Sequence, residues 1–139
     1  MRKDDCIFCK IAAGDIPSNT VYEDERFRVI LDLNPASKGH ALVLPKNHAD
    51  DIFDLSEEDR ASVLSVAARV AAAMKKALCC SGINIVQNNG ESAGQTVKHF
   101  HLHIIPRYDG DSAMVLWNPG KSDPEEQKKT AESIKAALE

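Results

Sequence analysis

The sequence has little that would hold a protein in a membrane or send it across one. Its longest apolar stretch, residues 61–80, is interrupted by Ser65, Arg69, Lys75 and Lys76. A membrane-spanning helix needs about 20 nearly uncharged residues. The chain starts Met-Arg-Lys-Asp-Asp-Cys, with acidic residues where a secretory signal carries its apolar segment. We therefore expect a cytoplasmic protein that has no contact with a membrane.

The chain also lacks an excess of positive charge, internal repeats and low-complexity linkers. It has 17 Lys and Arg against 21 Asp and Glu, a net charge of −4. This balance argues against a protein that binds nucleic acid through a general basic surface. With 139 residues, 43% of them apolar and 27% charged, the composition is that of one globular unit with its own core. No G-x-G-x-x-G follows an expected strand, which argues against a Rossmann fold.

Short apolar segments predict five strands, at residues 20–23, 27–31, 41–44, 83–87 and 100–105. One long helix is expected between the third and fourth strands. Its N-cap would be Ser56, which three acidic residues follow, and it would run to about Cys80 and end at Ser81-Gly82. Short connections without regular βαβ alternation predict an α+β fold with an antiparallel five-stranded sheet.

The last part of the chain differs in composition. We expect residues 1–110 to form the main domain and residues 111–139 to extend it as part of the same unit. Turn-forming residues run from Asn118 to Pro124, and a polar helix is expected after them, from Glu125 to Glu139. Its narrow apolar stripe would cap the core or contact a partner.

Three of the five histidines alternate in His99-Phe100-His101-Leu102-His103. Side chains of a strand alternate between its faces, so the three histidines would share one face, with about 6–7 Å between neighbours. Phe100, Leu102 and Ile104 would then lie in the core. Three explanations of the histidines are open: a solvated face, a catalytic zinc site with a free fourth position, and imidazole used as nucleophile and acid–base group.

The loop before this strand favours chemistry on phosphate. Residues 88–96 contain glycines, which allow close approach of the backbone, and Asn, Ser, Gln and Thr side chains, which can donate to phosphate oxygens. A neutral imidazole is a competent nucleophile toward phosphorus. Fixed donors would meet the negative charge that grows on the phosphate oxygens. Such a reaction needs no organic cofactor.

The same residues resemble a known family. His99 to Ile105 is similar to the His-φ-His-φ-His-φ-φ signature of the histidine triad (HIT) family, in which φ is apolar. Further blocks within the first 107 residues resemble its Hint-like branch, namely Cys6 to Ile11, Ile16 to Ser18, Tyr22 to Glu25, Asp32 to Pro35, Gly39 to His48 and Asn88 to Glu91.

This resemblance implies a homodimer of α+β protomers that binds a purine nucleotide at its α-phosphate. His101 would be the nucleophile of a covalent nucleotidyl-histidine that water hydrolyses. His103 would bind the phosphate and assist transfer to the leaving group, and His40 would be an additional active-site histidine. The implied substrate-binding residues are Asp32 on the ribose, Asn88, Gln95 and Thr96 at the phosphate and leaving group, and Phe8, Ile11, Ile30 and Leu33 around the base. Structural alternatives are that Asp32 caps the following turn and that Phe8 is ordinary core.

Cys6, Cys9, His48 and His99 form a second candidate group. Cys-x-x-Cys supplies two thiolates on one turn, and two histidines complete a tetrahedral Cys₂His₂ zinc site. The resemblance implies this set, because bacterial HIT members with the Cys-x-x-Cys bind a structural zinc there. Such a closed site leaves no position for a catalytic water. The alternative is a pair of buried thiols without metal. Cys79 and Cys80, at a helix end, are interpreted as packing residues.

The sequence departs from the Hint pattern directly after the triad. A pair of glycines is common there, whereas this chain has Pro106-Arg107-Tyr108. That ending resembles the dinucleoside polyphosphate hydrolase branch, in which Arg107 would reach a longer phosphate chain. We predict a purine nucleoside phosphoramidase. The alternatives are a hydrolase of dinucleoside polyphosphates or adenylylated metabolites, and a nucleotide-binding interaction module with little turnover.

Overall fold

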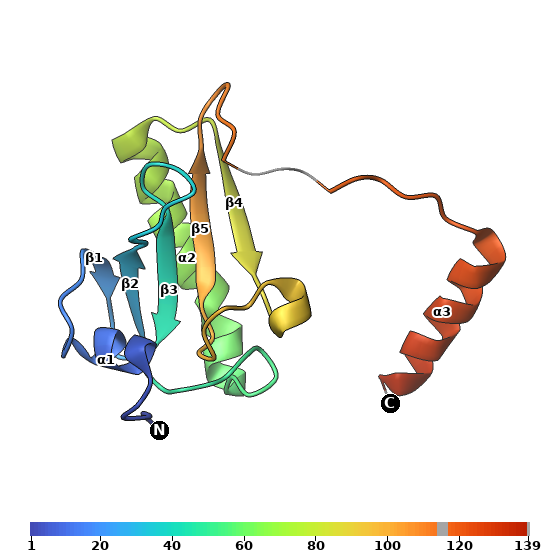
Figure 1. The fold of residues 1–139 in the computed structure, drawn as a ribbon, viewed down its shortest axis with the longest axis horizontal. Coiled ribbons are helices and arrows are strands. Elements are labelled where there is room, and N and C mark those ends of the chain that lie inside the picture. The colour runs from blue at the N-terminus through green and yellow to red at the C-terminus, as the bar shows by residue number, and fades with distance from the viewer. Residues whose placement is uncertain (114–116, 139) are drawn as a thin grey trace.

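The structure is a computed structural model that describes residues 1–113 and 117–138. One antiparallel sheet, in the order β1-β2-β3-β5-β4, forms its centre (Figure 1). The elements in chain order are α1 (Ile7–Ala13), β1 (Thr20–Glu23), β2 (Phe27–Leu31), β3 (Ala41–Pro45), α2 (Glu57–Leu78), β4 (Gly82–Gln87), the short 3₁₀ helix η1 (Glu91–Ala93), β5 (Leu102–Arg107) and α3 (Pro124–Ala137). The predicted α+β fold with five antiparallel strands and one long helix is confirmed.

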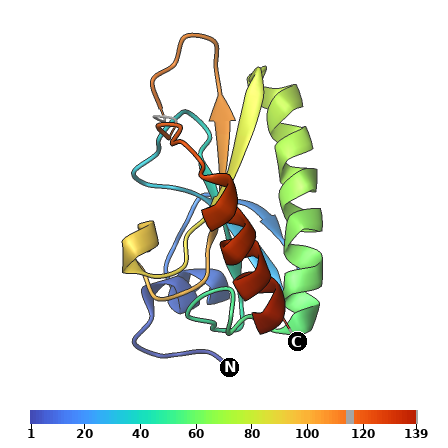
Figure 2. The ribbon, with the colours of Figure 1, turned by 90° about the vertical axis from the view of Figure 1, so that its right-hand side faces the viewer.

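The two faces of the sheet have different partners. The long helix α2 covers one face, while α1 and η1 lie on the other side (Figure 2). Between α2 and the sheet lies the larger core cluster, which includes Phe27, Val43, Val66 and Ile104. A smaller cluster, formed by Ala12, Ile30, Leu42 and Leu44, lies on the side of α1. Burial of both faces explains why β3 is apolar throughout.

Alternation along β5 follows the expected period. Phe100, Leu102 and Ile104 belong to the cluster under α2, as their spacing predicts. The strand itself begins at Leu102 rather than at Phe100, since the amide of Phe100 donates to the carbonyl of Ala49 and not to β3. Pairing of β3 with β5 therefore starts at Val43 and Leu102.

Two helices differ from the sequence expectation, one in where it ends and one in being present at all. Helix α2 ends at Leu78, because Cys79 adopts a left-handed conformation with φ of +53°. Helix α1 was not expected from the sequence. It begins after Cys6, whose sulfur accepts from the amide of Cys9, and ends at Gly14, whose φ of +88° favours glycine.

Helix α3 begins at Pro124 behind the N-cap Asp123, close to its expected start. None of its described residues is buried, and it stands apart from the sheet in Figure 1. That residues 111–139 belong to the same unit as the sheet stays a prediction. No helix among the described residues is both long enough and apolar enough to span a membrane.

Candidate functional site: a histidine cluster beside a Cys₂His₂ group

Three histidines gather on the face of the sheet opposite α2. His101 directly precedes β5, His103 lies within it, and His40 directly precedes β3. The rings of His40 and His103 and those of His101 and His103 each lie 5.1 Å apart, centroid to centroid. The antiparallel register places Leu42 opposite His103, so His40 is the diagonal neighbour of His103. The expected common face of the triad is thus observed for His101 and His103.

The backbone fixes which nitrogen of His101 carries the hydrogen. His101 Nδ1 donates to the carbonyl oxygen of His99 across 2.7 Å. A carbonyl can only accept, so in the neutral ring the hydrogen is on Nδ1 and Nε2 keeps its lone pair. Within the described part of the chain, Nε2 has no hydrogen-bond partner. A neutral imidazole with a free Nε2 is the form needed for nucleophilic attack.

A second chain of hydrogen bonds fixes the other two rings. The amide N–H of Ala36 donates to His40 Nδ1 across 2.9 Å, so the hydrogen of the neutral His40 ring is on Nε2. His40 Nε2 in turn donates to His103 Nδ1, also across 2.9 Å. His103 therefore carries its own hydrogen on Nε2. The cluster thus combines one free lone pair, on His101, with one free N–H donor, on His103.

Burial keeps the rings of His40 and His103 neutral. It lowers the pKa of His103 to about 4, helped by the neighbouring His101 and His40, which repel a further positive charge. Burial also lowers the pKa of His40, although the carboxylate of Asp32 opposes this change. At neutral pH the hydrogen-bond directions derived for the neutral rings of His40 and His103 therefore apply.

Asp32 contributes to the same region in two ways. Its Oδ1 accepts from the amide of Asn34 across 2.8 Å, which is the turn-capping role considered from the sequence. Its Oδ2 lies 3.6 Å from His40 Nε2 and carries no closer partner among the described residues. One oxygen of Asp32 therefore stays available for a ligand hydroxyl.

The predicted apolar wall is assembled in part. Phe8 and Ile11 from α1 pack against Ile30 in the smaller core cluster. Phe8 also meets the ring of His101 edge-on, at 5.1 Å between centroids. Leu33 lies in the loop after β2 and is 88% exposed, outside this cluster. Phe8, Ile11 and Ile30 thus belong to one apolar cluster, which Phe8 connects to His101.

The loop of residues 88–96 is held by Gln95. Its Oε1 accepts from the amide of Gly90, and its Nε2 donates to the carbonyls of Asp50 and Val97. Both N–H groups are therefore engaged within the protein, and Gln95 ties the loop to the segment after β3. Asn88 is half-buried and Thr96 is exposed at the two ends of the loop.

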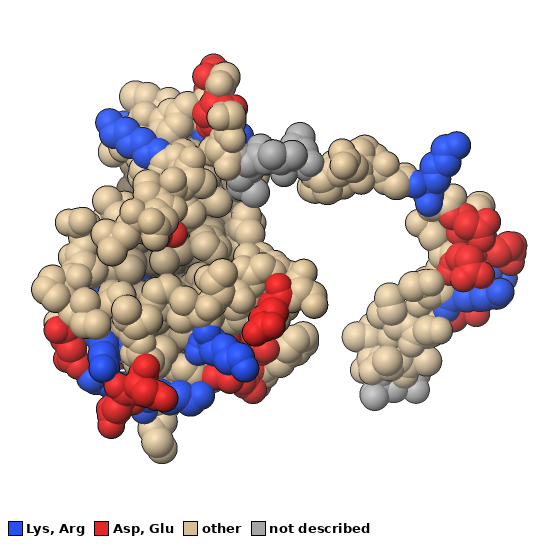
Figure 3. Space-filling model, in the orientation of Figure 1, with Lys and Arg blue, Asp and Glu red and all other residues tan. Residues whose placement is uncertain are grey.

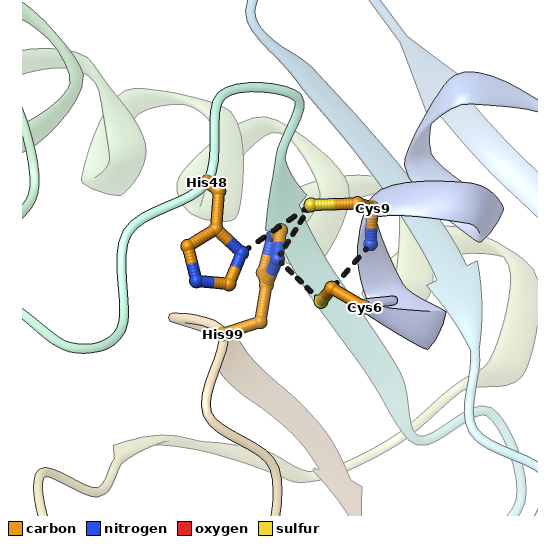
Figure 4. A group of neighbouring side chains, drawn as sticks. All are labelled: Cys6, Cys9, His48 and His99. Atoms are coloured by element: carbon orange, nitrogen blue, oxygen red, sulfur yellow. Dashed lines mark hydrogen bonds between the residues drawn. The ribbon is translucent and has the colours of Figure 1, made fainter. Parts of the chain in front are cut away.

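The four residues of the predicted metal group come together beside α1, as Figure 4 shows. His99 Nδ1 lies 3.4 Å from Cys6 Sγ and 3.5 Å from Cys9 Sγ. His48 Nδ1 lies 3.3 Å from Cys9 Sγ. A tetrahedral zinc, with bonds of about 2.3 Å to sulfur and about 2.0 Å to nitrogen, separates such atoms by about 3.5 Å. The spacing fits this metal.

The groups behind the two rings support the same conclusion. His99 Nε2 donates to the carbonyl of Pro45 across 3.0 Å, and His48 Nε2 donates to Asp50 Oδ1 across 2.7 Å. Both rings therefore turn an unprotonated Nδ1 toward the sulfurs, as metal ligands must. Asp50 also accepts from Lys3, and the hydrogen bonds from His48 and Lys3 lower its pKa to about 2. Sequence reasoning missed Asp50, whose only signal is its position two residues after His48.

A second group, Asp32, His40 and His103, also has ligand atoms within 4.8 Å of one another. Here the hydrogen-bond directions oppose a metal. The Ala36 amide occupies His40 Nδ1, which leaves the hydrogen on Nε2, the nitrogen that would have to bind the ion. We therefore treat this group as a hydrogen-bonded cluster and the Cys₂His₂ group as the candidate metal site.

Charge is sparse around the histidines. In the space-filling view, Lys, Arg, Asp and Glu gather at the lower edge of the sheet domain and on α3 (Figure 3). The surface in front of β3 and β5 consists mostly of other residues. A phosphate bound there would be held by neutral donors more than by ion pairs.

Comparison with known proteins identifies the family. The family model "HIT domain" matches residues 13–110, a segment that contains all five histidines. The chain belongs to the HIT family. The resemblance found in the sequence is thereby confirmed.

Relatives of this HIT protein match over nearly the whole chain. "Protein hit" of Bacillus subtilis strain 168 is 41% identical over 138 residues, which are 97% of this chain and 95% of the relative. The adenosine 5'-monophosphoramidase hnt1 of Schizosaccharomyces pombe is 41% identical over 134 residues, 96% of this chain and 98% of the relative.

Solved structures share the fold of this HIT protein. A crystal structure from Streptococcus mutans UA159 superposes with a TM-score of 0.94 at 40% identity, and covers 99% of this chain and 87% of its own. A zinc-bound histidine triad family protein from Mycobacterium smegmatis superposes with a TM-score of 0.76 at 41% identity, with 96% and 95% coverage.

Proposed function

We propose that this HIT protein is a purine nucleoside phosphoramidase that works through a nucleotidyl-His101 intermediate. The observation that carries the proposal is the hydrogen bond from His101 Nδ1 to the His99 carbonyl, because it leaves Nε2 free to attack. The monophosphoramidase activity named for the S. pombe relative, 41% identical over almost its whole length, supports the substrate class.

In the first step, His101 Nε2 forms a bond to the α-phosphorus and the bond from phosphorus to the leaving nitrogen breaks. The leaving nitrogen takes up a proton from solvent and departs as the amine, while His103 Nε2–H donates a hydrogen bond to a phosphate oxygen. In the second step, water attacks the phosphorus and releases a proton to solvent, and the bond from phosphorus to Nε2 breaks, which restores the free His101 ring. The His40 hydrogen bond keeps His103 in the donating form.

The apolar surface formed by Phe8, Ile11 and Ile30 would take the base, and Asp32 Oδ2 would accept from a ribose hydroxyl. We keep Asn88 and Thr96 as candidates for the phosphate side of the site. Gln95 serves as the clamp of this loop, since both of its N–H groups are bound to carbonyls. Leu33 would contact the base only if the loop after β2 moved inward.

One observation favours the phosphoramidase over a dinucleoside polyphosphate hydrolase. The guanidinium of Arg107 binds the carboxylate of Asp111 through Nε and Nη2 and donates to Asn84 Oδ1 through Nη1. These bonds tie the side chain of Arg107, at the end of β5, to β4 and to the turn that follows β5, so it is not free to bind a longer phosphate chain.

The test is a substrate panel run on one preparation. It contains adenosine and guanosine 5'-phosphoramidates, diadenosine polyphosphates and adenylyl-sulfate. We expect phosphoramidates to have the highest kcat/KM and mass spectrometry to detect a nucleotidyl adduct on the wild type. His101→Ala should lose nearly all turnover and the adduct while still binding AMP. Undiminished turnover in His101→Ala would show that His101 is not the nucleophile. A wild-type protein that binds AMP but turns over none of these substrates would favour the alternative of a nucleotide-binding interaction module.

The proposal includes a structural zinc held by Cys6, Cys9, His48 and His99. When bound, the zinc would link the N-terminal segment to the residues that precede β5. Support comes from the ligand spacing, from the two rings that present Nδ1 to the sulfurs, and from the zinc-bound relative of M. smegmatis. Both cysteines must be reduced to bind metal, which agrees with the proposed cytoplasmic location.

The proposal also includes a homodimer. β4 is an edge strand of the sheet, and an apolar groove runs between it and α2. Leu64, Ala68 and Ala71 from α2 and Ile85 from β4 line this groove. Leu64 is 62% exposed and Ile85 44% exposed in the single chain, so a symmetric partner would cover both an open strand edge and exposed apolar side chains.

A further inference from the structure

Two residues, His99 and Phe8, connect the candidate metal group to the histidine cluster. His99 turns its side chain to the two cysteines, while its backbone carbonyl accepts the hydrogen bond that orients His101. Phe8 lies between Cys6 and Cys9 in the sequence and meets the rings of both histidines edge-on. Its centroid is 6.0 Å from that of His99 and 5.1 Å from that of His101.

Helix α1 is short and is held by few contacts. It has seven residues, of which Cys9 and Ala12 are buried, while Phe8 and Ile11 are partly buried against the smaller core cluster. A helix this short is not stable by itself in water, so its place depends on contacts with the rest of the protein. Cys6 caps the helix through its sulfur, and Arg28 Nε donates to the carbonyl of Ala12 near its end. A metal that binds both cysteines would therefore fix the turn that carries Phe8.

We infer that metal binding at Cys6, Cys9, His48 and His99 and nucleotide binding beside His101 are energetically coupled, so that each strengthens the other. The coupling acts through Phe8 and through the His99 backbone. Because the metal holds both in place, the nucleotide meets a wall that is already ordered and a His101 ring that is already oriented. The inference rests on the proposed nucleotide site, but it adds a role that a purely structural zinc would not have.

Coupling between two sites is reciprocal, which gives a sharp test. Couplings in proteins commonly change affinity by about 5- to 150-fold. We expect a factor near the lower end, about 10-fold, since the metal orders one wall of the nucleotide site. AMP should bind the zinc-loaded protein about 10-fold more tightly than the metal-free protein, as measured by calorimetry. Zinc should bind more tightly by the same factor in saturating AMP.

The zinc measurement can be made on the loaded protein alone. Transfer of zinc to an excess of a coloured chelator is followed with and without AMP, and we expect AMP to slow the release several-fold. This assay works even if the metal-free chain is poorly folded. No effect of AMP on zinc release or zinc affinity, in a protein that binds AMP, would overturn the coupling. Failure of the zinc-loaded protein to bind AMP at all would instead overturn the proposed function.

Two substitutions between Cys6 and Cys9 distinguish an effect of the Phe8 ring from a general effect of altering this turn. Phe8→Ala should reduce the effect of AMP on zinc release to less than twofold at saturating AMP. Ile7→Ala is the matched control, because Ile7 is the adjacent residue and is 52% exposed. It should keep the full effect. An undiminished effect in Phe8→Ala, or an equal loss in Ile7→Ala, would overturn the assignment to Phe8.

Discussion

The hydrogen-bond chain from Ala36 through His40 to His103 predicts a specific defect when His40 is replaced. His40→Leu removes the donor that holds the hydrogen of His103 on Nε2. The Ala36 amide and His103 Nδ1 also lose their partner in a site where His40 is only 5% exposed. His103 can then place its hydrogen on Nδ1 and turn a lone pair toward the phosphate oxygens, which it would repel.

The magnitude follows from the groups left unpaired. An unsatisfied buried donor or acceptor costs about 1–3 kcal/mol. If this cost falls on the transition state, kcat decreases about 5- to 150-fold, at 1.36 kcal/mol per factor of ten. KM should change much less, since His40 is expected to act through His103 and not to touch the nucleotide. His40→Gln is the matched variant, because its Nε2 can still donate to His103, and it should retain most of the rate.

Two measurements check this reasoning. Steady-state kinetics with adenosine 5'-phosphoramidate give kcat and KM for the wild type and both variants. Nitrogen NMR of the histidine rings reports directly which nitrogen of His103 carries the hydrogen. A kcat for His40→Leu within twofold of the wild type would refute the role of His40. A wild-type His103 with its hydrogen on Nδ1 would refute the hydrogen-bond directions themselves.

Three further predictions concern acid stability, metal and assembly. The folded state holds His103 neutral down to a pKa of about 4, whereas the unfolded chain takes up that proton near 6.5, so stability should fall as the pH drops between these values. The difference between the two pKa values corresponds to about 3 kcal/mol of unfolding free energy, and solvent around the partly exposed ring reduces this to about 1–2 kcal/mol. We therefore expect His103→Asn to lose about 1–2 kcal/mol less stability than the wild type between pH 7 and pH 4, as measured by urea unfolding. An unchanged pH dependence of stability in His103→Asn would contradict this prediction. Protein prepared without chelator should contain about one zinc per chain, and Cys6→Ser should lose the metal and melt at a lower temperature; protein that neither contains zinc nor gains stability from it rules the site out. Light scattering should report twice 15.2 kDa for the wild type and a smaller particle for Ala68→Arg, and a wild-type particle of 15.2 kDa at all concentrations rejects the dimer.

Local sequence patterns predict the sheet and its faces well. The alternation of Phe100, Leu102 and Ile104 with histidines is a property of consecutive residues, and it placed the apolar three under α2. The start of β5 could not be found in this way. It depends on the amide of Phe100 bonding to Ala49, 51 positions earlier in the chain, and no local pattern reports that contact.

The sequence contains a weak signal for helix α1. Ile7, Phe8, Ile11 and Ala12 have helical spacing, and Gly14 follows at the position where helices commonly end. Seven residues are too few for periodicity to be decisive, and the cap is a cysteine rather than one of the usual polar residues. Gln95 illustrates a different limit. Its residue type suits a phosphate donor, but the carbonyls of Asp50 and Val97 already take both of its N–H groups.

The contrast between the two histidine-containing groups is determined by what lies behind each ring. Both groups combine imidazoles with acidic or thiol side chains at similar spacing, so residue type alone would allow a metal in either. Behind His99 and His48 stand acceptors, the Pro45 carbonyl and Asp50, which free Nδ1 for a metal. Behind His40 stands a donor, the Ala36 amide, which commits Nε2 to giving a hydrogen bond. The same imidazole is therefore prepared to bind a metal in one group and to relay a hydrogen bond in the other, and the acceptor or donor behind each ring makes this difference.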